Sequence, residues 1–180
     1  MRLAPVPLAF RANVELAVRN AGESSRTTHG APAAVDACRY FAGLLLGALG
    51  ERSKEEILSA LFCPGPDRDH WKRHALSTAI AEIANGSFKQ KKPPEIIGSG
   101  FVVRSLEAAL WAFHRSGSFK EGALHAVNLG DDADTTGAIY GQLAGAYYGV
   151  NAIPQEWMER LALRELISEK ATALFDFSNA

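Results

Sequence analysis

The sequence predicts an all-α protein, a compact bundle of several helices. Apolar residues recur every three or four positions along most of the chain, no segment alternates apolar and polar residues as a half-buried strand does, and no internal repeat is visible. The chain has 180 residues, of which 47% are hydrophobic and 22% are charged. This length and composition predict one globular domain over residues 1–180.

The periodic pattern places each helix in turn. Pro32 stands where the first residue of the second helix is expected, and Gly50 follows its last periodic residue as a C-cap. A breaker cluster at 63–67 ends one helix, and a polar stretch at 86–94 has no period and is expected to be an exposed connection. We therefore expect helices over 6–21, 32–49, 54–62, 71–83, 102–113, 118–127, 135–149 and 155–175.

Composition argues against several classes of partner. The formal net charge is −1 and the only basic cluster is a short one at 89–92, so we expect no nucleic-acid partner. The longest apolar runs, 41–49 and 138–150, are shorter than the roughly 20 residues that cross a bilayer, so we expect no membrane partner. Cys38 and Cys63 fit reduced core thiols, and the first residues lack a signal-peptide pattern; both favour a cytoplasmic location.

The segment 128–137 carries the most informative chemistry of the chain. Three aspartates and two threonines fill five of the six positions 131–136, and hard cations such as Mg²⁺ prefer oxygen ligands of this kind. Because residues two apart diverge on a continuous helix, Asp132 and Asp134 can converge on one ion only from a turn or a helix N-terminus. Capping of the following helix without metal is an equally open interpretation, since aspartate and threonine also stabilise helix N-termini.

An EF-hand loop is excluded at the same place. A loop beginning at Asp132 has Gly137 in the required position, but Thr136 stands at the fifth position and Leu143 where the bidentate glutamate belongs.

The predicted helix after this segment has a glycine at every fourth position. An interior glycine destabilises a helix by roughly 1 kcal/mol relative to alanine, so such a stripe is expected where another helix or a ligand approaches closely. We favour close helix packing. The glycines are Gly137, Gly141, Gly145 and Gly149.

Other polar residues allow two interpretations each. His29 lies in a polar loop before a helix, where it either contacts a ligand or caps and packs the loop. His70 and His74 are one helical turn apart and could share a metal, but nothing around them resembles H-E-x-x-H, so a solvated face is favoured. Glu107 lies alone on an apolar helix and is expected to make an interhelical hydrogen bond.

The segment 98–103 begins like a dinucleotide-binding fingerprint, with Gly98 and Gly100. Val103 stands where the third glycine belongs and no strand precedes it, so a turn that lets the backbone approach another group is favoured. The chain has no G-x-S-x-G elbow and no P-loop, which removes those nucleophilic and nucleotide-hydrolysing classes.

Four segments in conserved order resemble the ADP-ribosylglycohydrolase family. The stretch NLGDDADTTGAIYGQLAGAYYG at 128–149 is similar to the family signature N-x-G-G-D-x-D-T and its small-residue helix. Residues 1–6 resemble the end of the loop G-N-G-x-x-M-R-x-x-P, 28–32 the element T-H-x-x-P, and 98–111 the helix G-x-G-Y-V-x-x-x-L-x-A-A-L-W.

The resemblance implies an all-α hydrolase with a dinuclear Mg²⁺ or Mn²⁺ centre. Such an enzyme cleaves the glycosidic bond between ADP-ribose and a protein side chain or similar acceptor, so its partner is an ADP-ribosylated protein or an ADP-ribose-like small molecule. By position, the metal ligands are Asp132, Asp134 and Thr135. Asp131, which stands where many relatives have glycine, is an additional acid behind them. The resemblance also assigns substrate contacts to His29, Gly98, Gly100 and Asn128.

Two segments of the family pattern, G-D-x-x-G and T-D-D-T, do not occur here. In the family they carry the other metal ligands, so the expectation is an N-terminally truncated bundle, the C-terminal part of a longer or split enzyme, with a missing N-terminal fragment as a partner. Two carboxylates and one hydroxyl do not complete the six oxygens that Mg²⁺ prefers. The alternative is a non-catalytic module that binds an ADP-ribose-like ligand or a partner chain.

Overall fold

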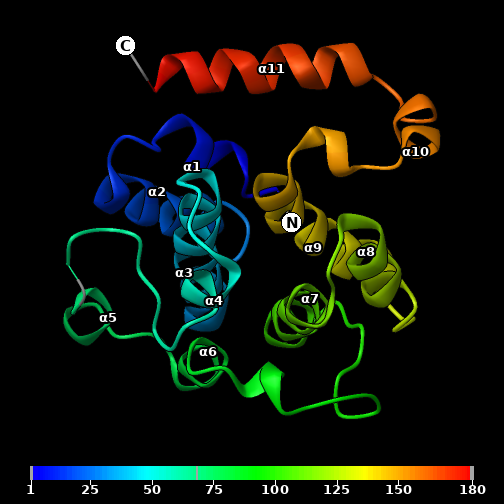
Figure 1. The fold of residues 1–180 in the computed structure, drawn as a ribbon. Coiled ribbons are helices and arrows are strands. Elements are labelled where there is room, and N and C mark those ends of the chain that lie inside the picture. The colour runs from blue at the N-terminus through cyan, green and yellow to red at the C-terminus, as the bar shows by residue number, and fades with distance from the viewer. Residues whose placement is uncertain (1, 68, 179–180) are drawn as a thin grey trace.

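The computed structural model describes residues 2–67 and 69–178, and within them it contains helices and connections but no strand (Figure 1). The predicted all-α fold is therefore confirmed. In chain order the elements are α1 (Pro5–Ala9), α2 (Val14–Arg26), α3 (Pro32–Leu49), α4 (Lys54–Ile57), α5 (His70–Arg73), α6 (Thr78–Ala84), η1 (Ser87–Lys89), α7 (Val102–Arg115), α8 (Phe119–Val127), α9 (Ala133–Tyr148), η2 (Val150–Ala152), α10 (Gln155–Glu159) and α11 (Arg164–Phe177).

Helix α3 is the centre of the fold. It packs against α1, α2, α4, α6, α7 and α9, and most of its side chains are buried. Among the described helices it alone is long and apolar enough to cross a membrane, but 72% of its 18-residue window is buried within the protein. Burial on nearly all sides is what a helix hydrophobic all round requires in a globular core.

Helices α7, α8 and α9 form the second half of the core. Gly122 on α8 lies directly against the ring and hydroxyl of Tyr140 on α9. That hydroxyl donates to the carbonyl oxygen of Phe119 at 2.9 Å, which joins the start of α8 to the middle of α9. The close approach fixes how α9, and therefore its N-terminus, sits in the bundle.

Lys54, at the start of α4, joins three elements through its ammonium group. Nζ donates to the carbonyl oxygens of Phe113 and Ser116, at 3.1 and 2.6 Å, and to the hydroxyl of Tyr148 at 2.6 Å. It also lies 4.5 Å from the centroid of the Phe113 ring. The cation thus satisfies carbonyls at the C-terminus of α7, where a positive charge is favoured, and holds the end of α9 against them.

The first and last helices of the chain lie together at the edge of the bundle (Figure 1). The guanidinium of Arg11 stands 3.7 Å from the centroid of the Phe175 ring, and Phe10 meets Phe177 edge to face at 6.4 Å. Most residues of α11 are exposed, so these few contacts hold it.

Three predicted helices are each broken in two. The expected helix at 6–21 stops after Ala9 and restarts at Val14, because the side chain of Asn13 accepts from the amide of Leu16 and caps the second piece. The helix expected at 71–83 is α5 and α6, and the amide of Ser77 between them donates to Asp36 at 2.7 Å. The one expected at 155–175 is α10 and α11, separated at Leu163, whose φ is +57°.

Two local predictions also need correction. The helix expected at 54–62 ends at Ile57, and Leu61, with φ of +52°, donates instead to the carbonyl oxygen of Ala84. The connection at 86–94 is not wholly exposed, because it contains η1 and buries Phe88 in the core.

The glycine stripe of α9 does not pack as predicted. A Cβ at Gly137 would lie 3.1 Å from the side chain of Val127, but at Gly141, Gly145 and Gly149 it would meet no described atom within 4 Å. Close helix packing is therefore wrong for these three positions in the part of the chain that the structure describes.

Candidate functional site

The acidic segment forms a strained turn followed by the first turn of α9. Gly130 and Asp131 have φ of +74° and +50°, both in the left-handed region, before Asp132 begins the helix. Glycine adopts this conformation freely and aspartate is among the residues that tolerate it. The positive φ gives a physical reason why the resembled signature has glycine where this chain has Asp131.

Asp132 caps α9 through its main chain and leaves its carboxylate available. Its carbonyl oxygen accepts from both the amide and the hydroxyl of Thr136, each at 3.1 Å, while its side chain makes no capping hydrogen bond. The Thr135 side chain, and after it that of Asp134, hold the pKa of the Asp132 carboxyl below its ordinary value by hydrogen bonding. The carboxylate is therefore ionised at neutral pH and is not consumed by capping.

Asp134 and Thr135 lie in the first turn of α9. The carboxylate of Asp134 accepts from the amide of Thr135 at 2.9 Å and is otherwise exposed, whereas Thr135 is mostly buried. Asp134 thus partly fulfils the capping interpretation and still presents an oxygen to solvent. Carboxylates at a helix N-terminus are stabilised by its partial positive charge.

The turn at Gly98 and Gly100 is folded against this segment, as the sequence interpretation of a close backbone approach predicts. A Cβ at Gly98 would collide with the carbonyl oxygen of Gly130, and one at Gly100 would stand 2.9 Å from Oδ2 of Asp132. The structure therefore brings together two predicted segments that are separated by about 30 residues in the sequence. Glycine is required at position 98, where a Cβ would meet backbone, whereas at position 100 it would displace the end of the Asp132 side chain.

Asn128 and His29 lie at the ends of different helices, and neither has a described contact with the aspartates. Asn128 is exposed and ends α8, where its amide donates to the carbonyl of Leu124 at 3.0 Å. His29 is exposed between α2 and α3, with Nδ1 at 3.0 Å from the Thr28 hydroxyl and its carbonyl oxygen accepting from Ser25. Both roles in substrate binding stay predictions.

The first residues of the chain link the His29 turn to α9. The guanidinium of Arg2 donates to the hydroxyl of Thr27 at 2.7 Å, and the amide of Ala4 donates to Oε1 of Gln142 at 2.8 Å. The segments resembling the family's M-R-x-x-P and T-H-x-x-P elements are therefore adjacent in space. Sequence reasoning did not identify Gln142, because nothing in the local pattern distinguishes it from a solvated polar residue of α9.

The aspartates do not by themselves form a closed metal centre. Across residues 2–67 and 69–178, no three side chains of histidine, cysteine, aspartate or glutamate gather closely enough to hold an ion. What the segment provides is a set of hard oxygen donors, the chemical type that Mg²⁺ and Mn²⁺ prefer, on a rigid helix end.

The structure also tests what the sequence predicted for Glu107, for the two cysteines and for the histidines near α5. Glu107 accepts from the hydroxyl of Ser87 and from Nζ of Lys91, so it makes the predicted hydrogen bonds between elements. Cys38 and Cys63 are free thiols, each half-buried. The solvated face predicted for the two histidines near α5 is wrong for His70, which is 8% exposed, and holds for His74.

The comparisons with known proteins all identify the same family. The family model of ADP-ribosylglycohydrolase matches residues 1–179. An ADP-ribosylarginine hydrolase, Tri1, of Pseudomonas putida (strain GB-1) is 39% identical over 176 residues, which are 98% of this chain and 44% of that protein. A protein of the same name in Serratia proteamaculans (strain 568) is 35% identical over 97% of this chain and 45% of its own length.

A solved structure agrees with the sequence matches. The chain superimposes on an ADP-ribosylglycohydrolase-related protein complex with a TM-score of 0.86 and 43% identity, over 98% of this chain and 58% of that one. The chain spans less than half the length of the two curated relatives and somewhat more than half of this structure.

Proposed function

Because this chain belongs to the ADP-ribosylglycohydrolase family, we propose that it supplies one half of a metal-dependent site that hydrolyses the bond between ADP-ribose and arginine. The observation that carries the proposal is the pairing of Asp132 with the Gly98–Gly100 turn at the N-terminus of α9. The choice of arginine as acceptor is supported by the two relatives that match nearly the whole chain, both of which are named ADP-ribosylarginine hydrolases.

The residues present fit a divalent cation but do not complete its coordination. The carboxylates of Asp132 and Asp134 and the hydroxyl of Thr135 would hold Mg²⁺ or Mn²⁺, and further oxygens would come from groups outside this set. When bound, such a cation supplies charge that polarises substrate oxygens and activates water. The dinuclear centre is a proposal that rests on the family resemblance and on this donor set.

The protein groups have separate roles in the proposed site. The Thr135 side chain lowers the pKa of Asp132, and the bonds from Thr136 to the Asp132 carbonyl fix its backbone. Because Gly100 has no side chain, its backbone leaves room for the Asp132 carboxylate and for a ligand beside it. His29, with Nδ1 beside Thr28, has Nε2 available to contact the substrate. Prearranged charge of this kind stabilises the positive charge that develops on the ribose during glycosidic cleavage.

A reconstitution assay tests the proposal. Residues 1–180 are mixed with a polypeptide carrying the family's G-D-x-x-G and T-D-D-T segments, and release of ADP-ribose from an arginine-linked peptide is measured with Mg²⁺ or Mn²⁺. We expect turnover by the pair, negligible turnover by residues 1–180 alone, and a loss of at least about 100-fold in Asp132→Asn and Asp134→Asn. Glu55→Gln, at an exposed position on α4, is the matched control.

The results of this assay distinguish a hydrolase from a non-catalytic binding module. If the pair binds ADP-ribose in calorimetry but never releases it from the peptide, while the intact Pseudomonas relative does so under the same conditions, the chain is a non-catalytic binding module. Turnover of serine-linked but not arginine-linked ADP-ribose would contradict only the proposed acceptor.

A further inference from the structure

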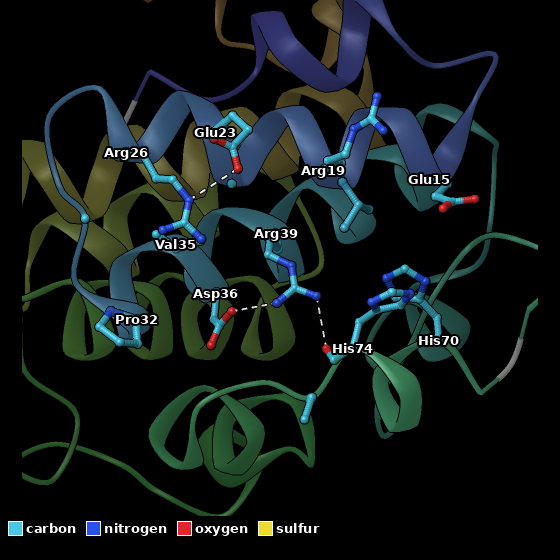
Figure 2. Close-up of a pocket in the computed structure, with 14 residues that line it drawn as sticks. Glu15, Arg19, Glu23, Arg26, Pro32, Val35, Asp36, Arg39, His70 and His74 are labelled. Atoms are coloured by element: carbon cyan, nitrogen blue, oxygen red, sulfur yellow. Dashed lines mark hydrogen bonds and ion pairs between the residues drawn. The ribbon is translucent and has the colours of Figure 1, made fainter.

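The connection between α2 and α3, which carries His29, is held by little packed protein. It runs from Arg26 to Pro32 beside a cavity of about 510 Å³ between α2, α3 and α5 (Figure 2). Residues 26–32 are all exposed, and a Cβ at Gly30 would meet no described atom within 4 Å. Because packing alone does not fix this connection, the direction of the His29 side chain depends on hydrogen bonds.

Ser25 fixes the main chain of His29, whereas Arg2 holds the two hydroxyls that precede it. The hydroxyl of Ser25 donates to the carbonyl oxygen of His29 at 2.9 Å, and the amide of His29 donates to the carbonyl oxygen of Ser25 at 2.7 Å. The guanidinium of Arg2 donates to the hydroxyls of Thr27 and Thr28, at 2.7 and 3.4 Å. The surroundings of the His29 ring therefore depend on Arg2 through Thr28.

Gln142 on α9 fixes the backbone from which Arg2 extends. An arginine side chain is flexible, so an exposed guanidinium orders its neighbours only if its own backbone is fixed. Oε1 of Gln142 accepts from the amide of Ala4 at 2.8 Å in a half-buried position, and Nε2 donates to the carbonyl oxygen of Ala138, which orients the carboxamide. Leu3, between Ala4 and Arg2, is buried in the core. The start of the chain is thereby attached to α9.

The Thr28 hydroxyl lies between Arg2 and Nδ1 of His29. A guanidinium only donates hydrogen bonds, so a hydroxyl that accepts from Arg2 keeps its own hydrogen for another acceptor. Nδ1 of His29 lies 3.0 Å from this hydroxyl. When Nδ1 accepts that hydrogen, the neutral ring carries its own hydrogen on Nε2, where it can donate to an oxygen of a ligand.

We propose that Gln142 is a positioning residue, which fixes the His29 side of the site relative to α9 through Ala4 and Arg2. This role rests on the proposed function, because α9 carries the proposed metal ligands Asp132 and Asp134 at its N-terminus. Positions 134 and 142 are about 12 Å apart along a helix axis, so Gln142 acts through other residues and not on the reacting atoms.

The nitrogen resonances of the His29 ring, measured at pH 8 in residues 1–180 and assigned with His29→Gln, test this role. Thr28→Val removes the hydroxyl and should move the Nδ1 resonance. We expect Gln142→Met, which has a similar length but no acceptor oxygen, to move it in the same direction by at least half as much. Gln142→Glu keeps an oxygen for the Ala4 amide and should restore most of the original position.

Two controls separate positioning from a general loss of structure. Gln155→Met, at an exposed position on α10, should leave the His29 resonances in place. The ring resonances of Tyr140, which report the joint between α8 and α9, should stay unchanged in Gln142→Met. Arg2→Met should reproduce the effect of Gln142→Met, and the double variant should move the Nδ1 resonance no further than either single variant, because both act through one chain of contacts. An unmoved Nδ1 resonance in Gln142→Met would contradict the role of Gln142.

The reconstituted pair gives the second readout. For release of ADP-ribose from the arginine-linked peptide, we expect kcat/KM to fall about tenfold in Gln142→Met and to recover to within about threefold in Gln142→Glu. Turnover with unchanged kcat/KM in Gln142→Met would refute the positioning role and leave the proposed function standing. Absence of turnover by the unaltered pair would contradict the proposed function alone, and the His29 resonances would still decide whether Gln142 positions the turn.

Discussion

The backbone of Gly100 lies so close to the carboxylate of Asp132 that a Cβ at position 100 would stand 2.9 Å from Oδ2. The contact couples the connection before α7 to the N-terminus of α9. It makes the position of one proposed metal ligand depend on the absence of a side chain in another segment.

Gly100→Ala is therefore expected to move the Asp132 carboxylate. In the reconstituted pair, Mn²⁺ affinity and hydrolysis should each fall by about tenfold or more, because ligand placement within about 0.5 Å matters at such sites. The stability of the chain should change little, since the turn is exposed. Gly117→Ala is the matched control, because its Cβ would meet its nearest atom, on Glu121, at 3.6 Å. Unchanged Mn²⁺ affinity in Gly100→Ala would show that the contact does not position Asp132.

Gly122→Ala tests the joint between α8 and α9. The added methyl group would overlap the Tyr140 ring and hydroxyl and the hydroxyl of Ser116, so we expect a loss of about 1–3 kcal/mol in the free energy of unfolding. Urea denaturation followed by circular dichroism measures it. Gly141→Ala should have the opposite effect, because the added Cβ would meet open space. Its higher helix propensity should raise the free energy of unfolding by up to about 1 kcal/mol. Equal effects of the two substitutions would refute the packing described.

Lys54→Met should destabilise the fold by about 1–3 kcal/mol. Methionine fills a similar volume but leaves the carbonyl oxygens of Phe113 and Ser116 and the hydroxyl of Tyr148 without their shared donor. Lys54→Arg should recover part of the loss, because it keeps the charge. Lys120→Met, which removes an exposed lysine paired with Glu156, is the control and should change stability by less than about 0.5 kcal/mol.

Stability should fall on mild acidification. Burial, followed by the charges of Arg115, Lys89 and Lys54, lowers the pKa of His114 below its ordinary 6.5. Burial lowers that of His70 also, with His74 and Arg39 adding to the shift and Asp67 and Glu15 opposing it. Below about pH 6.5 the unfolded chain therefore binds more protons than the folded chain, so the free energy of unfolding decreases as pH falls.

Denaturation midpoints measured with chelator at pH 7.5, 6.5 and 5.5 check this expectation. The slope should flatten in His114→Gln, because one of the two titrating groups is removed. The lowered pKa of Asp132 acts in a different window, below its ordinary 3.8, and does not enter over this range. If stability depends on pH equally steeply in His114→Gln, the pH dependence comes from other groups.

The sequence predicted the core helices well because their periodicity reflects burial. The centre of the bundle, α3, was located from its apolar spacing together with Pro32 and Gly50, and both ends agree with the structure. The break at Asn13 was missed because Val14 continues the apolar spacing of the preceding turn, so the pattern runs through the interruption. The break before Ser77 depends on a hydrogen bond to Asp36 on another helix, which no local pattern reports.

The sequence predicted which residues belong to the candidate site but not how they lie relative to one another. The aspartates were identified by their density, and the glycines at 98 and 100 by a motif that was incomplete. Their contact could not be read from either segment, since it depends on how α7 and α9 pack. The burial of His70 was missed for the same reason, because the walls around it come from α2 and α3.

The contact between Arg11 and Phe175 has a consequence for synthesis of the chain on the ribosome. These residues are separated by 164 positions, and the hydrogen bond from Ala4 to Gln142 spans 138. Helix α1 is synthesised before these partners, although it also packs on α2 and α3, which follow it directly. The contacts of residues 4 and 11 with residues 142 and 175 can therefore form only after the long intervening segment has been synthesised, which makes them long-range closures of the fold.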